Sequence, residues 1–113
     1  MKIWIDDVRT APEGYLWLKS VNEAKRVLTM VKSKNTVTSI LCKNIPTRYE
    51  VIELIDIDHD AGDYASDGGD YIKLLDWLEE TGRNYPIRIH SANAVGIENM
   101  RRIIERNGWK EVF

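Results

Sequence analysis

The sequence predicts an α/β fold with a mainly parallel sheet flanked by helices, and three observations support this prediction. Short apolar runs alternate with helical segments along the chain, as they do in strand–helix–strand units. The helical segments carry apolar residues three and four positions apart. Three of the apolar runs end in groups of polar residues rather than in ordinary turns. With 113 residues, the chain can build one core but not two, so we expect a single domain over residues 1–113.

Six short runs rich in apolar and β-branched residues are expected as strands: residues 2–6, 15–20, 35–42, 48–57, 86–90 and 109–113. The third and fourth runs are separated by a turn that contains Pro46, so they can pair antiparallel and give the sheet an antiparallel edge. Cys42 lies in the third run, where we expect a buried, reduced thiol. Residues 34–49 as a segment suggest no functional role.

Three helices are expected between and after these strands. Each combines an apolar stripe with a start or stop signal. They run from Ser20 or Asn22 to about Ser33, from Asp67 or Asp70 to Gly82, and from near Ala94 to Gly108.

Composition excludes several classes of function. The formal net charge is −2, with 16 basic and 18 acidic residues, which does not favour a protein that coats duplex DNA. The amino terminus has no signal-peptide core, and no apolar run is long enough to cross a bilayer. Together with the single cysteine, these features lead us to expect a soluble, cytoplasmic protein without a membrane partner.

The stretch IDIDHDAGD, residues 55–63, places four aspartates and a histidine directly after an apolar run. Two carboxylates about 4 Å apart repel by about 4 kcal/mol at an effective dielectric near 20, so such a cluster calls for a compensating cation. Parallel strands bring their carboxyl ends to one rim, where the acidic pair after the first strand would join this cluster. Mg²⁺ or Mn²⁺ is the expected cofactor. The candidate ligands are Asp6, Asp7, Asp58 and Asp60.

Other motifs fit less well. The same stretch resembles a calcium loop, but its glycine is one position early and the twelfth position lacks glutamate. Glycine-rich nucleotide loops and zinc-ligand spacings are missing. Without a functional role, the acidic pair Asp6 and Asp7 would be a solvated turn, and each histidine would be a structural residue hydrogen-bonded at a strand end. Asp56, inside its strand, suggests no role.

The three segments KIWIDDVR, IDHDAGD and IRIHSAN together resemble the signatures of receiver-like domains described as cyclic-phosphate-processing receivers. The resemblance implies a receiver-like (flavodoxin-like) fold related to response regulators. It also implies that Asp6 and Asp7 hold Mg²⁺, that Asp58 stands where receivers accept phosphate, and that Ser91 contacts a phosphate. Receivers use a lysine after a fifth strand, for which Lys110 is the nearest candidate.

The chemistry implied is the opening of a cyclic phosphate on a small molecule or an RNA end. His59 and His90, with a reference pKa near 6.5, suit proton transfer beside Asp58. The expected phosphate-binding residues are Arg9, Ser91 and Asn93. Two alternatives remain open: a signalling module phosphorylated on Asp58, and a protein that binds a cyclic nucleotide without turnover. The sequence leaves the oligomeric state open.

Overall fold

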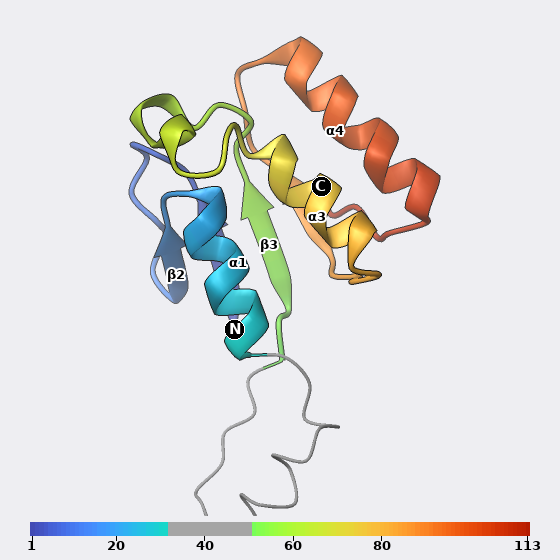
Figure 1. Cartoon of the computed structure of the whole chain (residues 1–113), viewed down its shortest axis with the longest axis horizontal. Coiled ribbons are helices and arrows are strands. Elements are labelled where there is room, and N and C mark those ends of the chain that lie inside the picture. The colour runs from blue at the N-terminus through green and yellow to red at the C-terminus, as the bar shows by residue number, and fades with distance from the viewer. Residues whose placement is uncertain (32–50) are drawn as a thin grey trace, which may run out of the picture.

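The computed structural model describes residues 1–31 and 51–113 and shows a four-stranded parallel sheet with helices (Figure 1). The strand order is β2-β1-β3-β4, and each described strand pair is parallel. This confirms the expected receiver-like α/β fold. In chain order, the elements are β1 (Lys2–Ile5), β2 (Tyr15–Leu18), α1 (Val21–Met30), β3 (Leu54–Ile57), the 3-10 helix η1 (Gly62–Ser66), α3 (Ile72–Glu80), β4 (Ile87–Ile89) and α4 (Ala94–Asn107).

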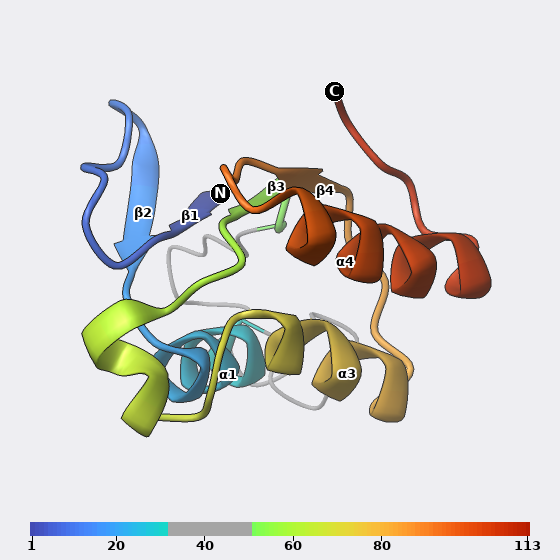
Figure 2. The ribbon, with the colours of Figure 1, turned by 90° about the horizontal axis from the view of Figure 1, so that it is seen from above.

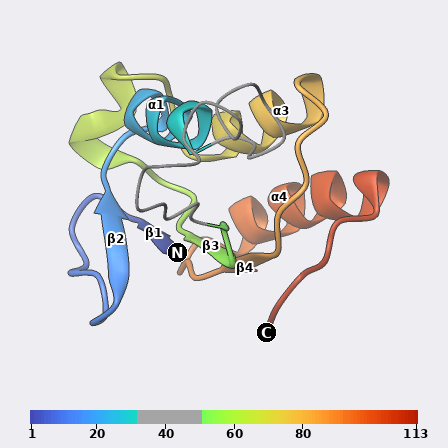
Figure 3. The same ribbon diagram turned by 90° about the horizontal axis from the view of Figure 1, so that it is seen from below.

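One face of the sheet forms the apolar core. Alternate residues of β1, β3 and β4 point toward the helices and are completely buried: Ile3, Ile5, Ile55, Ile57 and Ile87. Figures 2 and 3 show α1 and α3 as a layer on this side, with α4 beside α3 near the β4 edge. The apolar stripes of all three helices join the strand isoleucines in one buried cluster. This packing holds the strand ends in fixed positions.

The opposite face of the sheet is polar and aromatic. Trp4, Asp56 and Arg88 are register partners across β1, β3 and β4, so their side chains share this face. In the part of the chain that the structure describes, no helix covers it (Figures 2 and 3). Asp56 is nevertheless completely buried, so part of this face is shielded from solvent.

The first and last helices begin as the sequence predicts. Ser20 caps α1 by accepting from the Glu23 N–H at 3.0 Å, and Glu23 in turn accepts from the Lys19 N–H. Asn93 caps α4 by accepting from the Gly96 N–H at 2.8 Å. The first helix ends at Met30, earlier than the expected end near Ser33.

The predicted start of α3 at Asp67 or Asp70 is wrong, because α3 begins at Ile72. Gly68 and Gly69 adopt φ values of 115° and 92°, which keep the chain out of the helical region between the two aspartates. Asp67 instead accepts hydrogen bonds from the Ser20 hydroxyl and the Asn22 amide, so it ties this loop to the start of α1.

The remaining strand predictions have mixed outcomes. β3 occupies only the end of the expected run 48–57. The run 35–42 with Cys42 and the whole segment 34–49 lie outside the described residues. Residues 109–113 make a single parallel bridge, between Ile87 and Glu111, rather than a full edge strand. Among the described helices, none is long and apolar enough to span a membrane.

Candidate functional site

The ends of β1 and β3 bring two acidic segments together. Ile5 and Ile57 are register partners and the last residues of their strands, so Asp6 and Asp58 emerge side by side. The Asp58 N–H donates to the Ile5 carbonyl at 2.9 Å, which continues the ladder into the rim. The fold therefore joins two parts of the sequence that are more than 50 residues apart.

Asp7 completes a group of three carboxylates. One oxygen from each of Asp6, Asp7 and Asp58 lies within 4.8 Å of the other two. The loop leaves room for this group at Gly62, where φ is +54° and an added Cβ would overlap with Asp7 Oδ2. These are three of the four predicted metal ligands.

Asp6 and Asp7 respond differently to this crowding. Burial by itself would raise the pKa of Asp6, but the N–H groups of Arg9 and Val8 and the neighbouring His90 together lower it. The two N–H groups donate to Asp6 Oδ1 at 2.9 and 3.0 Å. For Asp7, burial raises the pKa, and the carboxylates of Asp6 and Asp58 raise it further. The crowding of the three carboxylates therefore contributes to the raised pKa of Asp7.

Two tryptophans hold the acidic loop in place. Trp4 Nε1 donates to the Arg9 carbonyl and Trp17 Nε1 to the Asp6 carbonyl, both at 2.8 Å. Trp4 and Trp17 are register partners on β1 and β2. The sequence analysis gave these two side chains no role at the rim. The sequence did contain a signal for this role, because both tryptophans alternate with apolar residues and so lie on the face of the sheet away from the core.

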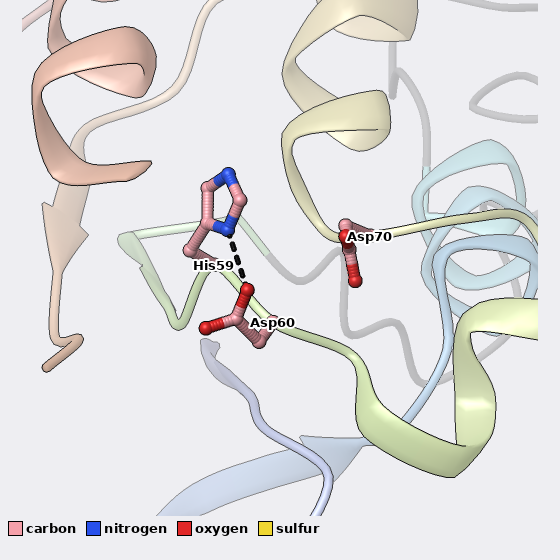
Figure 4. A group of neighbouring side chains, drawn as sticks. All are labelled: His59, Asp60 and Asp70. Carbon is pink, nitrogen blue, oxygen red and sulfur yellow. Dashed lines mark hydrogen bonds and ion pairs between the residues drawn. The ribbon is translucent and has the colours of Figure 1, made fainter. Parts of the chain in front are cut away.

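His59 lies beside the acidic group, paired with its neighbour Asp60. Figure 4 shows the ring with Nδ1 pointing toward Asp60 Oδ1, 2.9 Å away. The Asn93 amide lies 3.3 Å from the same oxygen, so α4 contributes to the orientation of this pair. Among residues 1–31 and 51–113, no hydrogen-bond partner faces His59 Nε2. One ring nitrogen is held and the other is available.

The helix α4 also positions His59 by shape. Gly96, in the first turn of α4, faces the imidazole ring so closely that an added Cβ would lie 2.5 Å from His59 Cγ. Asp70, which accepts from the Ala61 N–H, completes a second group: its carboxylate, Asp60 and His59 have ligand atoms within 4.8 Å of one another. Asp60 thus lies in this second group, separate from the three-carboxylate group that sequence reasoning placed it with (Figure 4).

His90 occupies a different environment from His59. Its Nε2 lies 2.9 Å from Asp6 Oδ2, and its Nδ1 lies 2.6 Å from Asp56 Oδ1. The ring stacks on Trp4 with a centroid separation of 3.8 Å and an interplanar angle of 7°. Both nitrogens of His90 therefore face buried carboxylates.

The predicted phosphate-binding residues surround the rim unevenly. The Ser91 hydroxyl accepts from the Asn93 N–H at 3.1 Å, immediately before α4. The Asn93 side chain is engaged on both ends, by Gly96 and by Asp60. Arg9 is exposed, and its backbone N–H and C=O are the groups that contact Asp6 and Trp4. Among the residues that the structure describes, neither the Ser91 hydroxyl nor the Arg9 guanidinium donates a hydrogen bond.

The three-carboxylate group fits Mg²⁺ or Mn²⁺. Hard cations take carboxylate oxygens. After burial, the carboxylates of Asp6 and Asp58 raise the pKa of Asp7, and a cation would offset this repulsion. Asp6 already accepts three hydrogen bonds, from Val8, Arg9 and His90. The residues that would hold the ion are therefore Asp7, Asp58 and Asp6, and these hydrogen bonds fix the orientation of the Asp6 carboxylate.

Comparison with known proteins gives one match. The model of a family described as "Cyclic-phosphate processing Receiver domain" matches residues 1–106. The match spans every strand, both acidic groups and nearly all of α4. No curated protein and no solved structure matches the chain at a significant level.

Proposed function

The chain belongs to the cyclic-phosphate processing receiver domain family, and from this premise we propose that it is a metal-dependent phosphoesterase acting on cyclic phosphates of nucleotides or RNA ends. One observation carries the proposal: three carboxylates gather within 4.8 Å at the ends of two adjacent strands, beside a histidine with one available nitrogen. Metal-holding acids next to a proton-transfer group are what hydrolysis of a phosphodiester requires.

The acidic group would bind the phosphate through a cation. When bound to Asp6, Asp7 and Asp58, Mg²⁺ or Mn²⁺ supplies charge neutralisation for the phosphoryl oxygens. The Asp6 carboxylate is held in one orientation by its two backbone N–H donors and by His90. Asp58 is further oriented by accepting from the His59 N–H at 2.7 Å.

His59 is the group that we assign to proton transfer. Water adds to phosphorus while one ring P–O bond breaks. His59 Nε2 takes the proton from water and returns it to the departing ribose oxygen, so the product is a phosphomonoester. Asp60 supports this role, because its carboxylate accepts from Nδ1–H and leaves Nε2 as the base. We do not assign proton transfer to His90, because both of its nitrogens already face carboxylates.

The remaining donors would orient the substrate. Arg9 follows the acidic pair on an exposed loop, and its guanidinium can form charge-assisted hydrogen bonds to phosphate oxygens. The Ser91 hydroxyl lies at the start of α4, whose amino-terminal dipole favours an anion at the same rim. These two residues are proposed to bind the substrate phosphate, and Asn93 is proposed to position His59 through Asp60.

The signalling alternative uses the same Asp58 as a phosphate acceptor, but one feature disfavours it. The Lys110 carbonyl accepts from the Ile87 N–H, which places Lys110 beside the first residue of β4. The acidic rim lies at the other end of the parallel strands. Lys110 therefore does not stand where a receiver lysine would contact a phosphorylated Asp58.

A turnover assay tests the proposal. The protein is incubated with 2′,3′-cyclic and 3′,5′-cyclic nucleotides and with an RNA that ends in a 2′,3′-cyclic phosphate, in Mg²⁺ or Mn²⁺, and products are followed by ³¹P NMR. We expect a phosphomonoester from at least one substrate. The product should disappear with EDTA and in Asp58→Asn, which removes one charge from the acidic group.

Asp63→Asn is the matched control, because Asp63 is exposed on η1 and belongs to neither group of candidate ligands. It should retain wild-type turnover. Turnover that survives both EDTA and Asp58→Asn would contradict the proposal. A labile mass increase after treatment with a small phosphodonor, lost in Asp58→Asn, would instead support the signalling alternative. Binding of a cyclic nucleotide with no product would support the third alternative.

A further inference from the structure

Asp56 is a buried carboxylate that the proposed mechanism does not use. It lies in the middle of β3, between Trp4 and Arg88 on the neighbouring strands, and it is completely buried. A buried carboxylate costs several kcal/mol unless other groups compensate it. The contacts of Asp56 therefore show which groups compensate the cost of its burial.

Within residues 1–31 and 51–113, only one of its two oxygens has a hydrogen-bond partner. Asp56 Oδ1 lies 2.6 Å from His90 Nδ1. Asp56 Oδ2 has no hydrogen-bond partner among the described residues, and the nearest cation on it is Arg88 Nη1 at 3.5 Å. The short contact to His90 is thus the main compensation for burying this side chain.

His90 connects Asp56 to the acidic group. Its second nitrogen, Nε2, lies 2.9 Å from Asp6 Oδ2, and Trp4 stacks on the face of the ring. A proton must lie between Nδ1 and Asp56 at 2.6 Å, whether it belongs to the imidazole or to the carboxyl. Asp6 accepts as a carboxylate, so Nε2 must carry the hydrogen of its 2.9 Å contact. A proton on Nδ1 then makes the ring an imidazolium held between two carboxylates, whereas a proton on the Asp56 carboxyl leaves a neutral ring with its hydrogen on Nε2. Asp56 thus supports the form of the ring that donates to Asp6.

We propose that Asp56 is a positioning residue of the metal centre, acting through His90 to orient the Asp6 carboxylate. This inference rests on the metal site of the proposed function, and it extends that site to the opposite face of the sheet. Groups that orient metal ligands in this way typically change metal affinity by about 10- to 100-fold when they are lost.

Mn²⁺ affinity, measured by electron paramagnetic resonance of free Mn²⁺, tests the inference without any substrate. Asp56→Leu removes the partner of Nδ1 and should weaken Mn²⁺ binding by about 10- to 100-fold. Asp56→Asn offers an amide that still donates to Nδ1, so it should stay within a few-fold of wild type. Leu54→Ala, two residues earlier on the same face of β3, is the control for a general disturbance and should leave the affinity unchanged.

Each outcome decides something different. Wild-type affinity in a folded Asp56→Leu overturns the positioning role alone. Equal loss in Leu54→Ala and Asp56→Leu also overturns it, because the effect would then be general. No Mn²⁺ binding by the wild type overturns both this inference and the proposed function. Mn²⁺ binding that follows the expected order, with no turnover of any cyclic phosphate, overturns only the proposed hydrolysis.

A second measurement covers the case in which Asp56→Leu does not fold. In the wild type, ¹⁵N NMR of the His90 ring at neutral pH should show a proton on Nε2. An unprotonated Nε2 would overturn the inference, because His90 would then have no hydrogen to donate to Asp6.

Discussion

The regions around His59 and His90 begin alike and become different sites. Each histidine follows the end of a strand, β3 or β4, and the two side chains are almost equally exposed, at 14% and 12%. Their partners differ. Asp60, beside His59, is 58% exposed, whereas the two carboxylates around His90 are completely buried. The two histidines thus differ in the exposure of their carboxylate partners and not in their own exposure. We therefore assign proton transfer to His59, with its exposed partner, and a structural role to His90, with its buried partners.

The largest expected effect follows from the available nitrogen of His59. His59→Ala should lower kcat for cyclic-phosphate hydrolysis by about 10²- to 10⁴-fold, the usual contribution of a general acid–base group. Mn²⁺ affinity should change little, because the three-carboxylate group does not include His59. Steady-state kinetics and Mn²⁺ titration on the same preparation check this. An unchanged kcat in His59→Ala would show that the assignment of proton transfer is wrong.

Replacement of His90 should lower the free energy of unfolding more than replacement of His59. His90→Ala leaves Asp6 and Asp56 buried without their shared partner, and breaking a buried ion pair costs about 3–5 kcal/mol of unfolding free energy. In His59→Ala only an exposed pair is lost, which is worth about 1 kcal/mol or less.

Urea unfolding of both variants measures the difference. Equal destabilisation of His59→Ala and His90→Ala would remove the distinction between the two regions. A His90→Ala variant that loses Mn²⁺ binding while remaining as stable as wild type would show that the buried pairs contribute little to the fold.

The sequence predicted the rim but not the roles of its side chains. Strand ends and parallel pairing follow from local pattern, so Asp6, Asp7 and Asp58 were placed together correctly. The direction of a side chain just beyond a strand depends on loop dihedrals that no periodicity encodes. Sequence reasoning therefore treated His59 and His90 as equivalent.

Asp56 shows that the register between strands gives information that the alternation of residues along one strand does not. Strict alternation in IDID already puts Asp56 and Asp58 on the face opposite Ile55 and Ile57. Its partner, however, lies 34 residues away at the end of a neighbouring strand. That contact depends on β3 lying next to β4 with Ile57 opposite Ile89, which local sequence does not specify.

The smallest expected effect concerns Asp6 and Asp7, adjacent residues of the three-carboxylate group whose pKa values shift in opposite directions. Asp6, held by backbone N–H donors and His90, has a lowered pKa, so its contribution to stability is present above the ordinary carboxyl pKa and is lost as pH falls through the lowered value. Asp7, raised by burial and by its acidic neighbours, has the opposite sign: its contribution is present below the ordinary pKa and is lost as pH rises through the raised value.

Asp7→Asn keeps this side chain neutral at every pH. It should therefore raise the free energy of unfolding at neutral pH by about 1 kcal/mol, the repulsion of two unit charges about 4 Å apart in water. The gain should shrink as pH is lowered toward the ordinary carboxyl pKa.

Mg²⁺ should stabilise the wild type but not Asp7→Asn, because a ligand stabilises only the state that binds it. Denaturant titrations across pH, with and without Mg²⁺, measure both effects, and Asp63→Asn is the exposed control. An Asp7→Asn variant that is less stable at neutral pH and still responds to Mg²⁺ would show that the crowded acids are compensated by the protein itself, which would leave no physical need for a cation at this rim.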